Sequence, residues 1–197
     1  MRPVILASRS VSRAAILRGA GVAFEAVDAG VDEDSAKAEL LDEGAGPRRI
    51  AERLAAMKAE AASAGRAGLV IGADQTLDLD GRLFDKAATA AEARERLIAL
   101  RGRPHHLHSA VAVAEDGAVI WKTADSPRLT MRAFSDAFLD GYLTRGGDAL
   151  LGSVGCYLLE GEGAQLFERI EGDYFAILGL PLLPLLGLLR DKGALAS

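Results

Sequence analysis

The chain has 197 residues, half of them hydrophobic, which is enough for one domain with a substantial core, so we expect a single domain over residues 1–197. A formal net charge of -5 argues against a protein whose whole surface binds nucleic acid, so any phosphate site must be local. One cysteine, Cys156, and no signal-like apolar run before Ser8 favour the cytoplasm.

The first segment is expected to form a short strand at residues 4–7 and then a helix that ends near Gly19. Between the two lie Ser8, Ser10 and Arg13. Hydroxyl groups, the free N–H groups of a first helical turn and a fixed positive charge are the usual components of a phosphate site. The alternative, in which the serines only cap the helix, stays open.

An acidic loop and a long helix follow. Residues 24–29 resemble a strand, and Glu33 comes after it on the expected loop. Residues 47–64 read as a helix, because a proline suits its first turn and apolar residues recur on one face. Lys58 lies at the edge of that apolar face.

The apolar run at residues 69–73 is the most informative element, because we expect this buried strand to end at Asp74 and deliver a carboxylate there. Ligands in open α/β folds bind beyond the carboxyl ends of strands. With the turn around Arg13, this predicts a cleft for an anion and a metal.

The second half is expected to complete a mixed sheet. In chain order we expect Lys86 after a turn, a helix capped by Thr89 and running to residue 100, a hairpin of residues 107–114 and 118–123, a helix from Ser135 to residue 143, and a core-packed terminal helix within residues 175–189. That last apolar run is too short and too interrupted by Gly and Pro to span a membrane. The three histidines at 105, 106 and 108 are expected to be structural or exposed, since a phosphate-binding metal prefers oxygen ligands.

The order of these motifs resembles the Maf family of nucleoside triphosphate pyrophosphatases. The matching pieces are Leu6 Ala7 Ser8 with Ser10 and Arg13, Val31 Asp32 Glu33, Arg53 Leu54 Ala55 with Lys58 Ala59, Gly72 Ala73 Asp74, Asp85 Lys86, and Gly179 Leu180 Pro181. The resemblance implies an α/β, ITPase-like fold: a mixed twisted sheet with flanking helices and two lobes around a central cleft. It also implies hydrolysis of nucleoside triphosphates to the monophosphate and pyrophosphate with Mg or Mn, to clear noncanonical nucleotides or restrain cell division. A homodimer is a further expectation of the family.

The same resemblance assigns roles to residues of this chain. Asp74 would be the catalytic acceptor or a metal-linked base, and Asp74 and Glu33 would hold the metal. The remaining residues expected around the substrate are Ser8, Ser12, Arg13, Lys58, Gln75, Lys86 and Glu160. Lys58, Lys86 and Glu33 would be catalytic together with Asp74.

Three features leave alternatives open. Gln75 and Glu160 are similar to the branch that accepts 7-methylguanosine triphosphate, but Ser12 stands where that branch has a tryptophan. Val11, Ser12 and Ala87 depart from the usual phosphate motifs, which leaves a catalytically weak nucleotide-binding regulator of cell division as the alternative function. A single-stranded nucleic-acid binder is disfavoured by the acidic balance and by the few aromatic residues.

Overall fold

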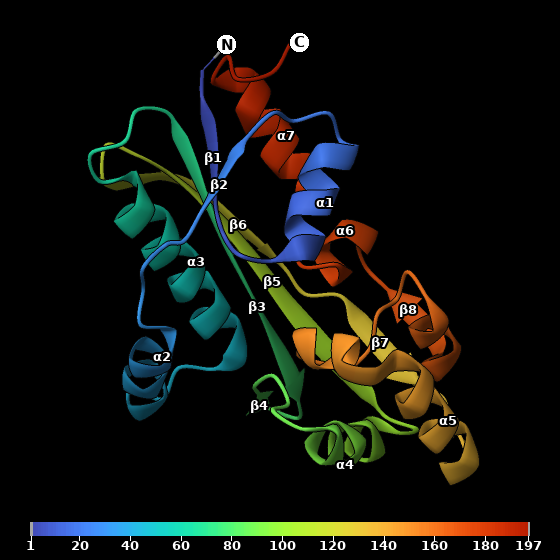
Figure 1. Cartoon of the computed structure of the whole chain (residues 1–197). Helices are drawn as coiled ribbons and strands as arrows, with labels where there is room; N and C mark the ends of the chain where they lie inside the picture. Colours follow the sequence, from blue (N-terminus) through green and yellow to red (C-terminus); the bar gives the residue numbers. More distant parts are fainter. Residues whose placement is uncertain (1, 197) are drawn as a thin grey trace.

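The computed structural model describes residues 2–196 and arranges them around one mixed sheet flanked by helices (Figure 1). The sheet is eight-stranded with the order β2-β1-β3-β5-β7-β8, while β4 pairs with β3 and β6 with β5. Its strands are β1 (Val4–Ala7), β2 (Glu25–Val27), β3 (Leu69–Leu79), β4 (Arg82–Phe84), β5 (Pro104–Glu115), β6 (Ala118–Asp125), β7 (Arg128–Met131) and β8 (Phe167–Glu171). β1 pairs in parallel with β2 and β3, and the other pairs are antiparallel, as expected for a mixed sheet.

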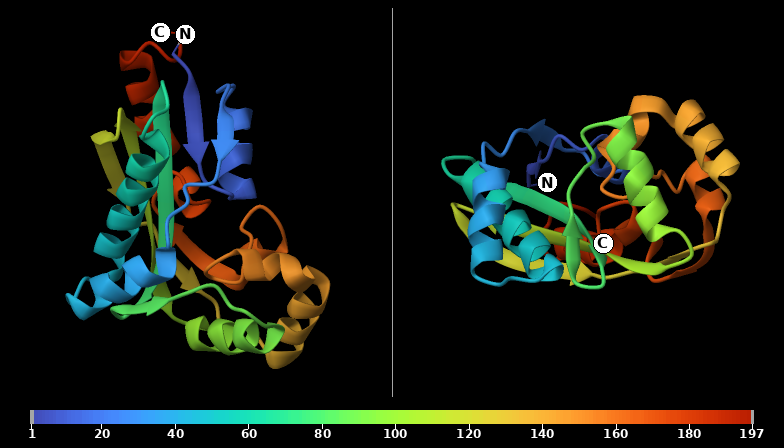
Figure 2. Two further views of the ribbon diagram at one scale, coloured as in Figure 1. Left: turned by 60° about the vertical axis from the view of Figure 1, so that its left-hand side comes forward. Right: turned by 90° about the horizontal axis from the view of Figure 1, so that it is seen from below.

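The helices cover both faces and one end of the sheet. They are α1 (Val11–Gly19), α2 (Glu33–Asp42), α3 (Pro47–Ser63), α4 (Ala90–Leu100), α5 (Asp136–Gly146), α6 (Tyr174–Ile177) and α7 (Leu182–Asp191), with short 3-10 helices η1 (Gly147–Gly152) and η2 (Glu162–Leu166). Figures 1 and 2 show α3 on one face and α1 and α7 on the other, with α4 and α5 grouped near the far end of the long strands.

Side chains alternate between the faces of β3 and β5, and this alternation separates the core into clusters. Ile71 and Val113 belong to the cluster under α1 and α7, which we call the α1–α7 cluster. Ala110 and Ala112 face the alanine-rich side of α3. The small side chains on both surfaces let α3 lie close to the sheet.

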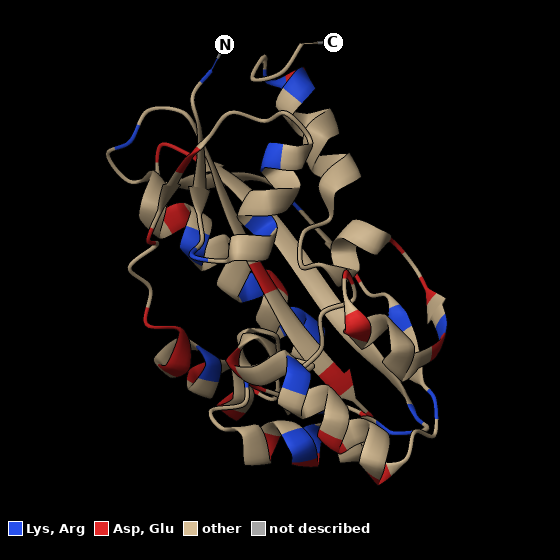
Figure 3. Cartoon of the chain, turned by 45° about the vertical axis from the view of Figure 1, so that its right-hand side comes forward, with Lys and Arg blue, Asp and Glu red and all other residues tan. Residues whose placement is uncertain are grey.

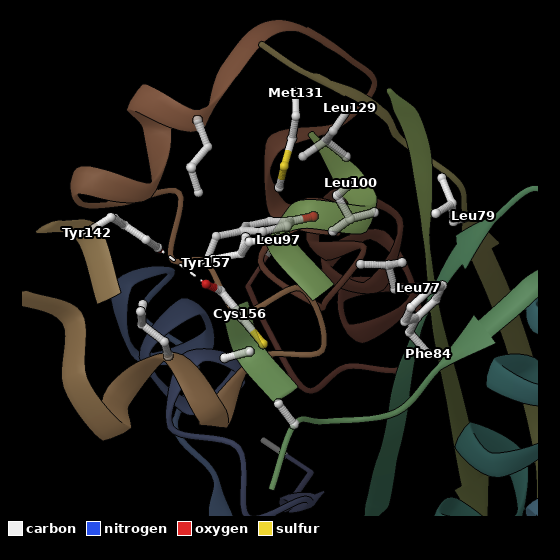
Figure 4. Close-up of a cluster of buried hydrophobic side chains, with 14 of the residues drawn as sticks. Leu77, Leu79, Phe84, Leu97, Leu100, Leu129, Met131, Tyr142, Cys156 and Tyr157 are labelled. Carbon is white, nitrogen blue, oxygen red and sulfur yellow. Dashed lines mark hydrogen bonds between the residues drawn. The ribbon is translucent and has the colours of Figure 1, made fainter. Parts of the chain in front are cut away.

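A second large cluster packs around the end of β3 and the start of β5, and we call it the α4–α5 cluster. Its members include Leu77, Leu79, Phe84, Leu97, Leu100, Leu129, Met131, Tyr142, Cys156 and Tyr157 (Figure 4). The single cysteine is buried there, and burial raises the pKa of its thiol. The Tyr142 hydroxyl donates to the Cys156 carbonyl at 3.3 Å.

Several sequence-based predictions are confirmed locally. α3 begins at Pro47, and the side chains of Thr89 and Ser135 cap α4 and α5. The β5–β6 hairpin turns through Asp116 and Gly117, and both have positive φ, as a two-residue type I′ turn requires.

Three expectations about element boundaries were wrong. The strand that starts at residue 69 does not end at Asp74 but continues to Leu79, because alternating apolar residues keep its core face buried. Glu33 begins helix α2 instead of lying on a loop; Asp32 caps that helix by accepting from the Ser35 N–H at 3.1 Å. The C-terminal apolar run forms two helices, α6 and α7, because Gly179 lies between them at φ +101°.

Candidate active site

The main pocket opens along an unpaired stretch of the β3 edge. β1 pairs with β3 only as far as Gly72, and β4 pairs with it only from Leu77 onward. β5 occupies the other edge from Val70 to Asp78. Residues 73–76 of β3 therefore have no strand partner on this side. The residues that follow β1 and those that follow β4 can meet there. Asp74 thus lies just beyond the C-terminal end of β1, although it is in the middle of β3 and not at its end.

This pocket has a volume of about 1120 Å³ and gathers every residue that the sequence suggested for a site. Its lining includes Ser8, Ser12, Arg13, Glu33, Lys58, Asp74, Gln75, Lys86 and Glu160. These residues come from several separate segments of the chain, so the fold brings them together. Figure 3 shows charged residues of both signs near the middle of the sheet as well as on the surface.

Lys58 lies at the centre of the charged part of the pocket. Its side chain extends from α3 and donates to Asp74 Oδ1 at 2.7 Å, and Glu33 Oε2 lies 2.8 Å from the same ammonium. Lys58 is only 6% exposed, and burying an ammonium is costly unless it is paired and hydrogen-bonded. The two carboxylates therefore hold this lysine in place, and it holds them together.

The N-terminus of α1 supplies the second part of the site. The Ser10 hydroxyl caps the helix by accepting from the Arg13 N–H at 3.3 Å, so the capping role left open for the serines is real. The Arg13 guanidinium donates to Ser8 Oγ at 3.2 Å and to the Gly179 carbonyl at 2.9 Å. Burial lowers the pKa of Arg13, and the nearby Asp74 carboxylate opposes that shift. Arginine stays protonated, so the pocket keeps a fixed cation beside a helix N-terminus.

Gln75 lies next to these groups but points to the other face of β3. The two N–H groups of its side-chain amide donate to Ser109 Oγ at 2.7 Å and, in part as a shared hydrogen bond, to the carbonyls of Ala176 and Ile177 at 3.1 and 3.0 Å. These bonds tie β3 to α6. Of the Gln75 side-chain amide, only the oxygen Oε1 is then available to a ligand. Gly179 lies beside that oxygen with φ +101°, a backbone conformation that favours glycine.

Another part of the pocket lining is more apolar than the part around Lys58 and Arg13. It includes Tyr157, Leu158 and Leu159, with the exposed Glu160 at its rim. Tyr157 was missed by the sequence analysis, because a single tyrosine in a loop gives no periodic signal. Its hydroxyl lies 2.8 Å from His105 Nε2, and burial lowers the pKa of that histidine to about 4.

The histidines occupy structural positions, as expected. His106 and His108 share a face of β5 with stacked rings, whereas His105 points to the opposite face. His108 Nε2 lies 3.2 Å from Asp78, and its Nδ1 lies 2.8 Å from Ser126 Oγ. Burial lowers the pKa of His108, although Asp78 opposes the shift.

The donor atoms in the pocket fit a divalent metal only in combination with a substrate. Within residues 2–196 no three His, Cys, Asp or Glu side chains are grouped closely enough to hold a metal ion by themselves. Asp74 and Glu33 offer one or two carboxylates, which is the number Mg²⁺ uses when phosphate oxygens complete its shell. The lining is also more acidic than basic: Asp28, Asp32, Glu33, Asp34, Asp74, Asp85 and Glu160 against Arg9, Arg13, Lys37, Lys58 and Lys86.

Comparison with known proteins places this architecture in a family. The family model described as "Maf-like protein" matches residues 3–192. The chain belongs to the Maf-like protein family. A relative from Caulobacter vibrioides, named "Nucleoside triphosphate pyrophosphatase", is 63% identical over 99% of this chain and 98% of its own.

Other relatives of this Maf-like protein carry a narrower name. One from Rhizobium etli, named "7-methyl-GTP pyrophosphatase", is 49% identical over 98% of this chain and 97% of its own. Among solved structures, a HAM1 protein from Coxiella burnetii matches 68% of this chain and 75% of its own with 17% identity and a TM-score of 0.42. Among the described helices, none combines the length and the apolar character needed to cross a bilayer.

Proposed function

We propose that this Maf-like protein hydrolyses nucleoside triphosphates to the monophosphate and pyrophosphate, with water attacking the α-phosphorus. The observation that carries the proposal is the convergence of three cations, Arg13, Lys58 and Lys86, with the carboxylates Asp74 and Glu33 on one pocket. Fixed cations stabilise the charge that develops on the transferred and departing phosphate groups, and this stabilisation usually contributes most to the catalysis of phosphoryl transfer.

Each part of the site has a step that it can perform. Arg13, Ser8 and the first turn of α1 would bind phosphate oxygens. Only Oδ1 of Asp74 contacts Lys58, so Oδ2 can accept a hydrogen bond from the attacking water and take its proton. Lys86, which is exposed at the far side of the pocket, would neutralise the departing pyrophosphate.

A divalent cation, Mg²⁺ or Mn²⁺, would be held by Asp74 and Glu33 together with oxygens of the nucleotide. When bound, it would neutralise phosphate charge and lower the pKa of a coordinated water. The acidic balance of the lining supports this part of the proposal, because a bare triphosphate entering the pocket would meet more carboxylates than cations.

The base would lie against the apolar wall around Tyr157 and Leu158. Glu160 at the rim can accept hydrogen bonds from the ring N–H and exocyclic amine of guanine, whereas uracil or thymine would present a carbonyl oxygen to it. We therefore propose a guanine-type base, including its 7-methylated form, as the preferred substrate. In a cell, such an activity would remove noncanonical nucleotides before they are incorporated.

The test is pyrophosphate release from the canonical nucleoside triphosphates and 7-methylguanosine triphosphate, with and without Mg²⁺ or Mn²⁺. We expect metal-dependent release that falls at least about 100-fold in Asp74→Asn, because the carboxylate that receives the proton is lost. Asp116→Asn, the same change in the β5–β6 turn, is the matched control and should leave the rate unchanged.

The alternative function gives a different result in the same assay. A regulator that has lost efficient hydrolysis would bind nucleotide without releasing pyrophosphate. Of the three departures that suggested it, Val11 and Ser12 line the pocket in the first turn of α1, where Ser10 still caps the helix, and Ala87 is buried in the α4–α5 cluster. Absence of release from every substrate, with folded protein and metal present, would reject the enzyme.

A further inference from the structure

Two pocket residues to which the sequence analysis assigned no role form an ion pair with each other. The Lys37 ammonium on α2 pairs with the Asp85 carboxylate, which follows β4. Both residues line the pocket, and the Lys37 side chain is 19% exposed, against 62% for Asp85. Neither has a place in the chemistry described above.

The position of Lys37 on its helix connects the pair to the centre of the site. Glu33 and Lys37 are four residues apart on α2, so they lie on the same face of the helix, one turn from each other. Glu33 contacts Lys58, while Lys37 contacts Asp85. One face of α2 thus touches both α3 and the segment after β4.

The position of Asp85 connects the pair to Lys86. The chain from Asp85 to Ala87 has no regular secondary structure, and Lys86 is exposed. The apolar neighbours Phe84 and Ala87 anchor this segment in the α4–α5 cluster. Leu83 of β4, just before this segment, packs against the cluster that holds Ala36 and Leu40 of α2, and the Asp85–Lys37 pair adds a polar contact between α2 and the segment itself.

We propose that Lys37 and Asp85 are positioning residues that hold Lys86 at a fixed place relative to the Glu33–Lys58–Asp74 group. This inference rests on the proposed function. Both sets of charges line the same pocket, so their relative placement would decide whether the attacked phosphorus and the departing pyrophosphate of a bound triphosphate are both stabilised. Small displacements of positioning groups cost a large part of catalytic rate.

Three variants separate this role from the obvious alternative, in which Lys37 binds phosphate directly. Asp85→Asn breaks the pair but keeps the lysine. Lys37→Glu breaks it and removes the lysine. The combination Lys37→Glu with Asp85→Lys restores a pair of reversed polarity.

For a positioning pair, we expect kcat to fall about tenfold or more in both single variants and to recover in the reversed pair. The temperature of thermal unfolding should stay unchanged, since an exposed ion pair adds little to stability. Raising the salt concentration should lower the activity of the wild type more than that of Asp85→Asn. The matched control is Asp140→Asn, which breaks an exposed Arg94–Asp140 pair between α4 and α5.

Two results would overturn the inference. Full activity in Asp85→Asn, with loss in Lys37→Glu that the reversed pair does not restore, would make Lys37 a direct phosphate ligand. Full activity in both single variants would make the pair irrelevant to turnover. If the wild type releases no pyrophosphate, the proposed function itself fails, and this outcome is distinct because it appears before any variant is compared.

Discussion

At the scale of single residues, Lys58 shows how the pocket maintains two carboxylates close together. Asp74 and Glu33 both contact its ammonium, so their mutual repulsion is offset before any ligand arrives. A nucleotide with its metal would bring a second cation to the same carboxylates. On the proposed function, the lysine would then be free to donate hydrogen bonds to phosphate oxygens, so one side chain would serve both the empty and the occupied site.

His105 predicts that stability depends on pH in a defined window. The side chain is 1% exposed and burial lowers its pKa from 6.5 to about 4. Between these values the unfolded chain binds a proton that the folded chain excludes. The free energy of unfolding should therefore fall as the pH drops from 6.5 to about 4, by roughly 3 kcal/mol from this group. Urea unfolding at several pH values measures the slope.

The contribution of His105 to the pH dependence of stability can be separated from the contribution of the carboxylates. His105→Gln has no ionisable group at this position and can still hydrogen-bond to Tyr157, so its stability should depend less on pH in this window. His106→Gln changes the half-buried neighbour on the opposite face of β5 and removes only the smaller cause of the lowered pKa of His105, so it should keep most of the slope of the wild type. Equal slopes for wild type and His105→Gln would contradict the assignment.

At the scale of elements, the distance between α3 and β3 sets the geometry of the site. A Cβ atom added at Gly72 would lie 2.2 Å from the Ala55 carbonyl oxygen and 2.5 Å from the Ala59 amide nitrogen. Both are backbone atoms of α3, which cannot move aside as a flexible side chain can. Only glycine permits this approach, and the approach brings Lys58 within reach of Asp74.

Gly72→Ala should therefore damage both stability and activity. We expect the free energy of unfolding to fall by about 1–3 kcal/mol from overpacking, together with loss of pyrophosphate release as α3 moves away from β3. Gly187→Ala is the matched control: its added Cβ meets nothing within 4 Å in α7, so it should raise stability by about 0.5–1 kcal/mol. Denaturant unfolding and the release assay test both variants, and an undamaged Gly72→Ala would refute the argument.

The sequence predicts elements well where they have a strong periodic pattern or a clear cap. α3 has a long apolar face and a proline at its start, and α4 has Thr89 as its cap, so both were found with nearly correct bounds. α2 was missed because only Ala36 and Leu40 are buried on it, which leaves almost no periodic signal. The continuation of β3 past Asp74 was missed because a polar pocket residue was taken as the end of the strand.

The same reasoning explains which site residues could be found. Asp74, Lys58 and Arg13 stand next to recognisable strands and helices, so motif order could assign them to one site. Lys37 and Tyr157 could not be found, since a lysine on an unpredicted helix and a tyrosine in a loop become pocket residues only through tertiary packing. The shared contact of Lys58 with two carboxylates is likewise visible only in three dimensions.

At the scale of the whole molecule, two long strands connect the parts that surround the pocket. β3 contributes Ile71 to the α1–α7 cluster and Leu77 to the α4–α5 cluster, and β5 contributes Val113 and Leu107 to the same two clusters. The N-terminal turn of α1 lies beside the first cluster, and Lys86 follows β4 beside the second. Because the strands are continuous, we propose that the two clusters unfold together.

This arrangement predicts a single thermal unfolding transition, and binding of nucleotide should raise its midpoint temperature. In Asp74→Asn, which should bind substrate without turning it over, a nucleoside triphosphate with Mg²⁺ at 100 times its Kd should stabilise the fold by about 2.7 kcal/mol. Calorimetry should show a single peak shifted to higher temperature, because a nucleotide bound in the proposed site would contact residues beside both clusters. Arg13→Met should reduce the shift by weakening phosphate binding, whereas Lys122→Met on exposed β6 should not. Two separate peaks, with only one moved by nucleotide, would contradict the proposal. They would mean that the two clusters unfold independently although β3 and β5 run through both.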